Sequence, residues 1–248
     1  RDYKVTGVQT CALPIFSSGY RSTPSSQGRD NEWLRSGGMD LKWGVNESFT
    51  LDATLVPDFG QVISDNNVLN LSPYEIRFQE NRPFFTEGTE LFNKAGLFYS
   101  RRIGLTPDGY YDVNSMAAND SNISIVKNPG VTQLINAVKF SGRNKKNWGI
   151  GVFNAVSAPM YATIKDKQTG TLQKIQTAPL TNFNVFVLDK ALKGRSYITF
   201  TNTNVTRDGT SHDANVSALD FSFFDKKNTY GDRKSTRLNS SHLVISYA

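Results

Sequence analysis

Hydrophobic and polar residues alternate between residues 39 and 55, which is the clearest pattern in the chain. The apolar positions are Met39, Leu41, Trp43 and Val45, followed after a turn near Asn46 by Phe49, Leu51, Ala53 and Leu55. Side chains on a β-strand switch faces at every residue. The pattern therefore predicts an antiparallel hairpin with one apolar and one polar face.

Similar alternation returns after residue 133. It predicts strands over residues 134–141, 148–156, 182–190, 195–206 and 214–224, with a polar turn at 165–170. In the second of these, Trp148, Ile150 and Val152 fall on one face, and Gly149 and Gly151 on the other. Short turns alternate with longer polar loops, which is typical of an up-and-down β-meander.

The stretch between these two groups of strands has no clear period. We expect residues 57–132 to form an irregular insert, with one short helix near residues 72–78 and a polar loop at 112–122. Residues 17–38 are rich in serine, glycine and arginine, and we expect a loop there.

Two β-architectures fit the alternation. A soluble sandwich packs its apolar faces together, whereas a membrane barrel turns them to lipid. The polar positions are small and uncharged in places, as at Ser141, Thr199 and Thr201, which suits a lumen wall. Aromatic residues lie near strand ends, as in barrels: Trp43, Trp148, Tyr197, Phe221 and Phe224. Against a barrel, Asn136, Asn202 and Asn204 interrupt the apolar positions.

Both ends of the chain resemble translated sequencing adaptor. Residues 232–242 are what a common short-read adaptor encodes in one frame, and residues 245–248 continue it; residues 5–15 fit a reverse complement. We therefore assign residues 1–15 and 232–248 to adaptor-derived sequence and exclude them from fold reasoning. Residues 16–231 are then expected to be an internal fragment of a longer β-barrel domain.

Excluding these ends changes the composition. They hold five of the 28 basic and two of the 22 acidic residues, so the net charge falls from +6 to +3. A nucleic-acid partner thereby loses its main support. Cys11, the one cysteine, also falls in the excluded part, so we expect no disulfide, thiolate metal site or thiol nucleophile.

Several motifs in the first half of the chain resemble domain-of-unknown-function family 5916. They lie at residues 38–44, 51–62, 70–72, 80–88 and 97–104, in the same order as in that family. The resemblance implies an outer-membrane β-barrel of Gram-negative bacteria. It also implies an upstream carbohydrate-binding module of family 9, which would lie before residue 17, so sugar binding cannot be assigned to these residues. The family supplies no activity to transfer to named residues.

The charged and aromatic part of the insert is the main candidate site. Its charged residues are Glu80, Arg82, Glu87, Glu90, Arg101 and Arg102. They could form a binding patch inside a barrel, or an arginine–carboxylate network that pins the insert to the wall. Because charges are costly on a lipid-facing surface, we expect them to face the lumen or the periplasm.

Other chemistries have weaker support. Ser211, His212 and Asp213 are adjacent, but a catalytic triad is defined by spatial geometry, and no nucleophile elbow is present. The oxygen-bearing residues between 108 and 122 do not match the calcium-loop spacing, so we expect neither a metal nor another cofactor. A glycosidase would need two carboxylates across a sugar site, for which Glu80 and Glu87 are the nearest candidates.

The sequence thus predicts an all-β, antiparallel up-and-down barrel of outer-membrane type, present as a fragment with an irregular insert. We expect a non-enzymatic pore or surface receptor whose partners are outer-membrane lipid and, through the upstream module, carbohydrate. The alternative is a soluble all-β domain that binds carbohydrate or accompanies a glycoside hydrolase.

Overall fold

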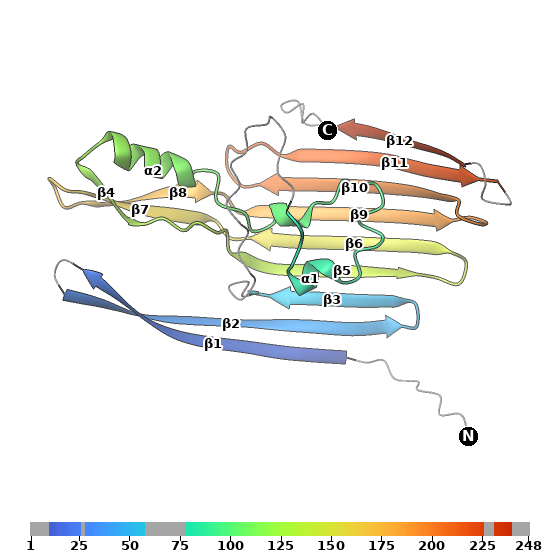
Figure 1. Cartoon of the computed structure of the whole chain (residues 1–248), viewed down its shortest axis with the longest axis horizontal. Coiled ribbons are helices and arrows are strands. Elements are labelled where there is room, and N and C mark those ends of the chain that lie inside the picture. The colour runs from blue at the N-terminus through green and yellow to red at the C-terminus, as the bar shows by residue number, and fades with distance from the viewer. Residues whose placement is uncertain (1–9, 26–27, 58–77, 226–230, 240–248) are drawn as a thin grey trace, which may run out of the picture.

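The computed structural model describes residues 10–25, 28–57, 78–225 and 231–239. Its larger sheet has nine antiparallel strands (Figure 1). Their order across the sheet is β1 (Thr10–Ser25), β2 (Gly28–Asn46), β3 (Phe49–Leu55), β5 (Leu134–Arg143), β6 (Trp148–Ser157), β9 (Thr181–Ala191), β10 (Tyr197–Arg207), β11 (Ala214–Phe224) and β12 (Gly231–Asn239). This confirms an all-β antiparallel fold. Among the described residues the sheet is open, with β1 and β12 at its edges.

The strands expected after residue 133 match β5, β6, β9, β10 and β11 within two residues at each end, whereas β2 begins eleven residues before the expected strand at Met39. The first predicted hairpin is the β2–β3 pair, in which Trp43 lies opposite Leu51. The carboxamide Oδ1 of Asn46 accepts hydrogen bonds from the backbone N–H groups of Ser48 and Phe49, at 2.8 and 3.0 Å. This side-chain turn explains why the chain reverses at Asn46.

The two faces of the sheet differ in chemistry. One face, here called the covered face, is buried and largely polar or small. It comprises Asp52, Thr54, Ala137, Lys139, Gly149, Gly151, Phe153, Ala155, Val185, Val187, Asp189, Thr199, Thr201, Ala218 and Asp220. Ser141 lies on the same side, as the alternation predicts for a polar position.

The opposite face, here called the open face, is apolar and largely uncovered. It comprises Leu51, Leu55, Val138, Phe140, Ile150, Val152, Phe186, Leu188, Ile198, Phe200, Leu219, Phe221 and Phe223. The exposed fractions of Val152, Phe186 and Phe200 are 42%, 41% and 38%. In β3, β5, β6, β9, β10 and β11 the only charged residue on this face is Lys190, whose ammonium lies 4.8 Å from the Trp148 ring centroid at the strand ends.

Four asparagines form one row across the open face of β6 and β9–β11. Asn154, Asn184, Asn204 and Asn215 lie directly opposite one another on successive strands. The Asn154 carboxamide donates to the Oδ1 of Asn184 at 2.8 Å. Of the three asparagines expected to interrupt the apolar positions, Asn204 lies in this row, whereas Asn136 and Asn202 lie outside it, opposite Leu55 and Phe186. The row borders one end of the apolar surface in these strands, and Trp148 lies at the other end.

Residues 78–105, here called the cover segment, pack on the covered face of the main sheet. It contains α1 (Pro83–Thr86) and the short 3-10 helix η1 (Ser100–Arg102), and it runs across the sheet (Figure 1). Phe85, Leu91, Phe92 and Ile103 are buried on it, and they pack against sheet residues Leu134, Ala137, Phe153, Ala155, Val185 and Val187.

Glycines in β6 make room for this packing. A Cβ atom on Gly151 would lie 3.1 Å from the Phe92 ring, and one on Gly149 would lie 2.9 Å from a methyl carbon of Leu91. These contacts are too close for a larger residue without movement. The glycines therefore serve the docking of the cover segment.

A second, three-stranded sheet lies beyond one end of the main sheet. Its order is β4 (Ile123–Lys127), β7 (Met160–Asp166) and β8 (Leu172–Ala178), and α2 (Tyr110–Asn119) packs on it through Val113, Ala162 and Ile164 (Figure 1). The polar turn expected at residues 165–170 joins β7 to β8. There the Asp166 carboxylate accepts the backbone N–H groups of Gln168 and Thr169.

Two expectations about loops are wrong. Most of the loop expected at residues 112–122 is helix α2, whose only buried residue is Val113, so a one-residue apolar contact left no periodic pattern. Residues 17–25 and 28–38 lie in the β1–β2 pair rather than in a loop, because their backbones pair in continuous register from Thr10–Trp43 to Ser25–Gly28. The helix expected at residues 72–78 lies almost wholly outside the described residues. None of the described helices is long and apolar enough to cross a membrane.

Candidate functional site

Glu80 and Arg82 form the central contact of the cover segment. The Arg82 guanidinium binds the Glu80 carboxylate through two hydrogen bonds, Nε to Oε1 at 2.8 Å and Nη2 to Oε2 at 2.7 Å. The Arg82 backbone N–H also donates to Oε1, at 3.0 Å. Arg82 immediately precedes Pro83, whose fixed φ angle suits the first position of α1. This bidentate geometry is the strong form of an arginine–carboxylate pair.

Arg82 also ties the two ends of the cover segment together. Its guanidinium donates to the carbonyl oxygens of Ile103 at 2.6 Å and Ser100 at 2.8 Å, and it lies 4.1 Å from the Phe85 ring centroid. The side chain is only 5% exposed. A buried guanidinium with this many partners holds irregular backbone in place.

The Glu80 carboxylate is held ionised by its neighbours. Burial alone would raise its pKa, but hydrogen bonds from the Arg82 side chain, the Ser100 hydroxyl and the Arg82 backbone outweigh that effect. The pKa of Glu80 therefore lies below its ordinary value. The Ser100 hydroxyl donates to Oε2 over 2.6 Å.

Glu87 belongs to a separate contact between the cover segment and the sheet. The Lys42 ammonium on β2 donates to its Oε2 at 2.6 Å, and this hydrogen bond lowers the pKa of Glu87. Close by, the ammonium of Lys139 on β5 donates to the backbone carbonyls of Phe84 and Glu87, at 2.8 and 2.5 Å. Lys139 is 2% exposed and lies 3.4 Å from the Asp52 carboxylate.

The six predicted site residues are therefore divided among several places. Glu80 and Arg82 form one buried pair, while Glu87 contacts β2. Glu90 is exposed, Arg101 is partly buried, and Arg102 lies 5.9 Å from the Tyr99 ring centroid. All six belong to the cover segment, on the side of the sheet away from the open face.

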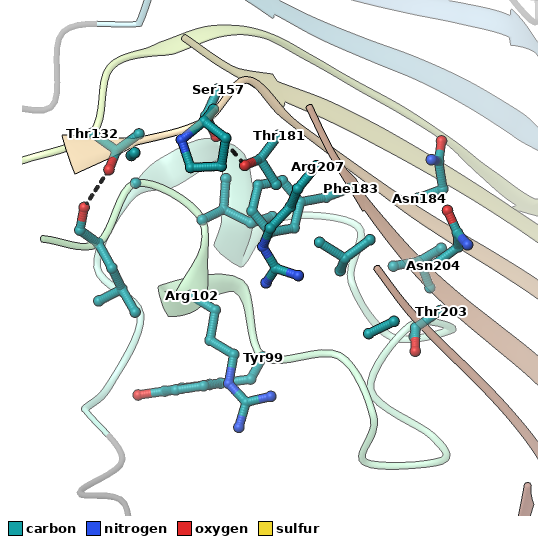
Figure 2. Close-up of a pocket in the computed structure, with 18 of the residues that line it drawn as sticks. Tyr99, Arg102, Thr132, Ser157, Thr181, Phe183, Asn184, Thr203, Asn204 and Arg207 are labelled. Atoms are coloured by element: carbon teal, nitrogen blue, oxygen red, sulfur yellow. Dashed lines mark hydrogen bonds between the residues drawn. The ribbon is translucent and has the colours of Figure 1, made fainter. Parts of the chain in front are cut away.

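A cavity of about 360 Å3 lies between the cover segment and the sheet. Residues 97–108 form one wall, and β6, β9 and β10 form the other. Figure 2 shows the side chains of Arg102, from η1, and Arg207, from β10, extending into this space beside Tyr99 and Phe183. Arg207 also donates from Nη1 to the carbonyl of His212, at 2.5 Å.

The comparison with known protein families decides where the chain belongs. The model of the family described as Domain of unknown function (DUF5916) matches residues 11–244. The chain belongs to the DUF5916 family. The match confirms the resemblance that the motifs between residues 38 and 104 carry. No curated protein and no solved structure matches the chain.

A further buried charge network of this DUF5916 chain contains none of the predicted site residues. Asp189 on β9 is fully buried, and its carboxylate accepts from Lys94 of the cover segment at 2.8 Å and from the Thr199 hydroxyl at 2.5 Å. Arg143 on β5 binds its second oxygen. Charged residues at polar positions of alternating strands, such as Asp189 and Lys139, were the available signal. Their partners could not be read from the alternation.

Metal chemistry has no candidate among the residues that the structure describes. Nowhere in these residues do three or more histidine, cysteine, aspartate or glutamate side chains gather as a metal site would need. The acidic residues near α2 do not converge, since Asp120 instead accepts the backbone N–H of Asn122, at 2.9 Å.

Proposed function

We propose that this DUF5916 chain is part of an outer-membrane β-barrel protein. Its open face would contact lipid, and the cover segment would lie on the lumen side. In this proposal the protein is a non-enzymatic receptor or pore. The family resemblance links that role to carbohydrate capture by an upstream module.

The observation that carries the proposal is the inverted chemistry of the two sheet faces. The covered face buries Asp189, Asp220 and Lys139, whereas the open face exposes Val152, Phe186 and Phe200. In water-soluble proteins a sheet usually buries its apolar face and solvates its polar one. A barrel in a membrane reverses this, because lipid covers the outside and the interior is polar.

The distribution of charge agrees with that assignment. Arginine or lysine on the lipid face costs about 2–4 kcal/mol at the bilayer midplane and close to zero near the interfaces. Lys190 is the only charge on the open face of β3, β5, β6 and β9–β11, and it lies at the end of β9 beside Trp148. An ammonium beside tryptophan at a strand end is expected where a barrel meets the lipid headgroups.

The cover segment favours a receptor over an open pore. It is fixed by the apolar packing of Phe85 and Phe92 and by the Lys94–Asp189 ion pair. A segment fixed in this way inside a barrel would obstruct the lumen, as inserted chain does in plugged barrels.

The carboxylates of the cover segment do not suit glycoside hydrolysis. A glycosidase needs a general acid whose pKa is raised. Cationic partners instead lower the pKa of both Glu80 and Glu87. We therefore propose no hydrolase role for this pair.

Cell fractionation and gel mobility test the membrane proposal. The full-length gene product, expressed in a Gram-negative host, should appear in the outer-membrane fraction. Samples left unheated in detergent should migrate differently from boiled samples, because a folded barrel resists unfolding in mild detergent. Recovery as a soluble periplasmic protein with no heat-dependent shift would contradict the proposal and favour a soluble all-β carbohydrate-binding or hydrolase-associated domain.

A further inference from the structure

We propose that the cavity between the cover segment and strands β6, β9 and β10 binds a small ligand that carries a carboxylate or phosphate group next to an apolar part. The cavity volume of about 360 Å3 falls within the range of small-molecule sites, roughly 300–1,000 Å3. It lies at the end of the sheet where the chain leaves for α2 and the second sheet.

Two guanidinium groups supply the recognition of an anion. Arg102 comes from η1 and Arg207 from the end of β10, and both line the same cavity (Figure 2). Asp108, which is exposed, is the only acidic residue among those that line it. Arginine suits this role because its planar N–H donors match the oxygens of carboxylate and phosphate groups.

The remaining walls select the rest of the ligand. Phe98, Ile103, Phe183 and Val185 line the cavity and offer apolar and aromatic surface. Apolar walls with a few polar groups are typical of small-molecule sites, in which the polar groups fix the ligand's orientation. An apolar or aromatic group attached to the anion would fit against this surface.

Three hydroxyl groups in the cavity walls already donate to backbone carbonyls. Thr132 donates to the Leu105 carbonyl at 2.7 Å, and Thr181 donates to the Pro179 carbonyl at 3.2 Å (Figure 2). The Thr203 hydroxyl donates to the carbonyl of Val216, at 3.5 Å. The Ser157 hydroxyl also lines the cavity and has no hydrogen-bond partner. The charged donors of the cavity are the guanidinium groups of Arg102 and Arg207, which favour a negatively charged ligand over a neutral one.

Calorimetric titration of the purified full-length protein tests the proposal with three probes of similar shape. The probes are phenylacetate, phenyl phosphate and the neutral 2-phenylethanol. We expect at least one anion to bind roughly tenfold or more tightly than the neutral probe, as charge-assisted hydrogen bonds require. The tighter of the two anions would distinguish a carboxylate from a phosphate ligand. Equal binding of all three probes, or no binding of either anion, would overturn the proposal.

Matched variants locate the site. Arg207→Gln and Arg102→Gln should each weaken anion binding roughly tenfold or more. Arg195→Gln makes the same change in the turn between β9 and β10, at the other end of the sheet, and should leave binding unchanged. Undiminished anion binding by both cavity variants would place the ligand elsewhere and refute the proposal.

Chemical protection provides a readout that needs no variant. In the unmodified sequence, saturating anion should slow the reaction of phenylglyoxal with Arg102 and Arg207, but not with Arg195, as measured by mass spectrometry. Equal reaction at all three arginines with and without the anion would count against the site. These assays measure anion binding in detergent or in buffer and do not depend on the membrane. If no anion binds, the membrane proposal is unaffected. If the protein is soluble, it can still bind the anion.

Discussion

At the scale of single residues, the buried Asp189 carboxylate links the cover segment to the sheet. Lys94, Arg143 and Thr199 all donate to it, from three different parts of the chain. A buried carboxylate is tolerated only where such partners replace water. Asp189 therefore holds segments together that are far apart in sequence.

Asp189→Asn should destabilise the fold. The amide leaves two cationic side chains without their counter-charge, and we expect a loss of about 2–4 kcal/mol in the free energy of unfolding. Denaturant titration in detergent measures it. The control Glu90→Gln neutralises an exposed carboxylate of the cover segment and should change stability by less than about 0.5 kcal/mol. Equal effects of the two substitutions would show that the Asp189 network does not stabilise the fold.

Glu80 should make the stability of the protein depend on pH. Its pKa is lower in the folded protein than in the unfolded chain, where glutamate titrates near about 4.3. Its ionised form therefore stabilises the fold above that pH, and the contribution is lost as the pH falls below it through the folded pKa.

The measurement compares denaturant midpoints of the native sequence and Glu80→Gln between pH 6 and pH 3. The glutamine variant should be the less stable at pH 6, and the difference should shrink on acidification. A difference that stays constant with pH would contradict the role given to the Glu80 carboxylate.

At the scale of elements, the cover segment packs closely on strand β6 because β6 has glycines at the points of contact. Gly151→Ala would place a Cβ atom 3.1 Å from the Phe92 ring. We expect this overpacking to cost about 1–3 kcal/mol and to loosen the cover segment. Limited proteolysis should then cut within residues 78–105 faster than in the native sequence.

Gly130→Ala is the control, because its Cβ atom would meet Tyr110 at an ordinary 3.7 Å. That variant should show no faster cleavage of the cover segment. Unchanged proteolysis of Gly151→Ala would mean that the cover segment adapts, and that the close contact of Phe92 with β6 is not required.

The alternation of residues predicted strands of the main sheet, but it did not predict helix α2 or the strands of the smaller sheet. In β11 the predicted bounds, residues 214–224, coincide with the observed strand, because Leu219, Phe221 and Phe223 alternate with Ala218, Asp220 and Ser222. Helix α2 was missed because Val113 is its only buried residue. Strands β7 and β8 were also missed; β7 pairs with β4 and with β8 in the separate three-stranded sheet.

The candidate site was predicted only in its local part. Glu80 and Arg82 are two residues apart, and their pairing follows from short-range geometry. The partners Lys94 and Asp189 lie 95 residues apart, so their contact exists only after the sheet has formed and the cover segment has docked. The cavity arginine Arg207 was missed for the same reason.

At the scale of the whole molecule, the asparagine row and Trp148 mark the two borders of the open face. Asn154, Asn184 and Asn215 lie toward one end of these strands, and Trp148 lies at the other. Apolar side chains such as Val152 and Phe200 fill the area between them. A large exposed apolar surface marks a place where something other than water makes contact.

Spin-label accessibility in lipid bilayers tests most directly whether that contact is lipid. In a Cys11→Ser background, a nitroxide label is placed at Val152→Cys on the open face or at Ser141→Cys on the covered side, next to each other on paired strands. The label at residue 152 should be relaxed more by oxygen than by a water-soluble nickel complex, and the label at residue 141 should show the reverse. A lipid-facing sheet would be contradicted if the nickel complex relaxed the label at residue 152 as strongly as oxygen does, or if neither reagent relaxed it.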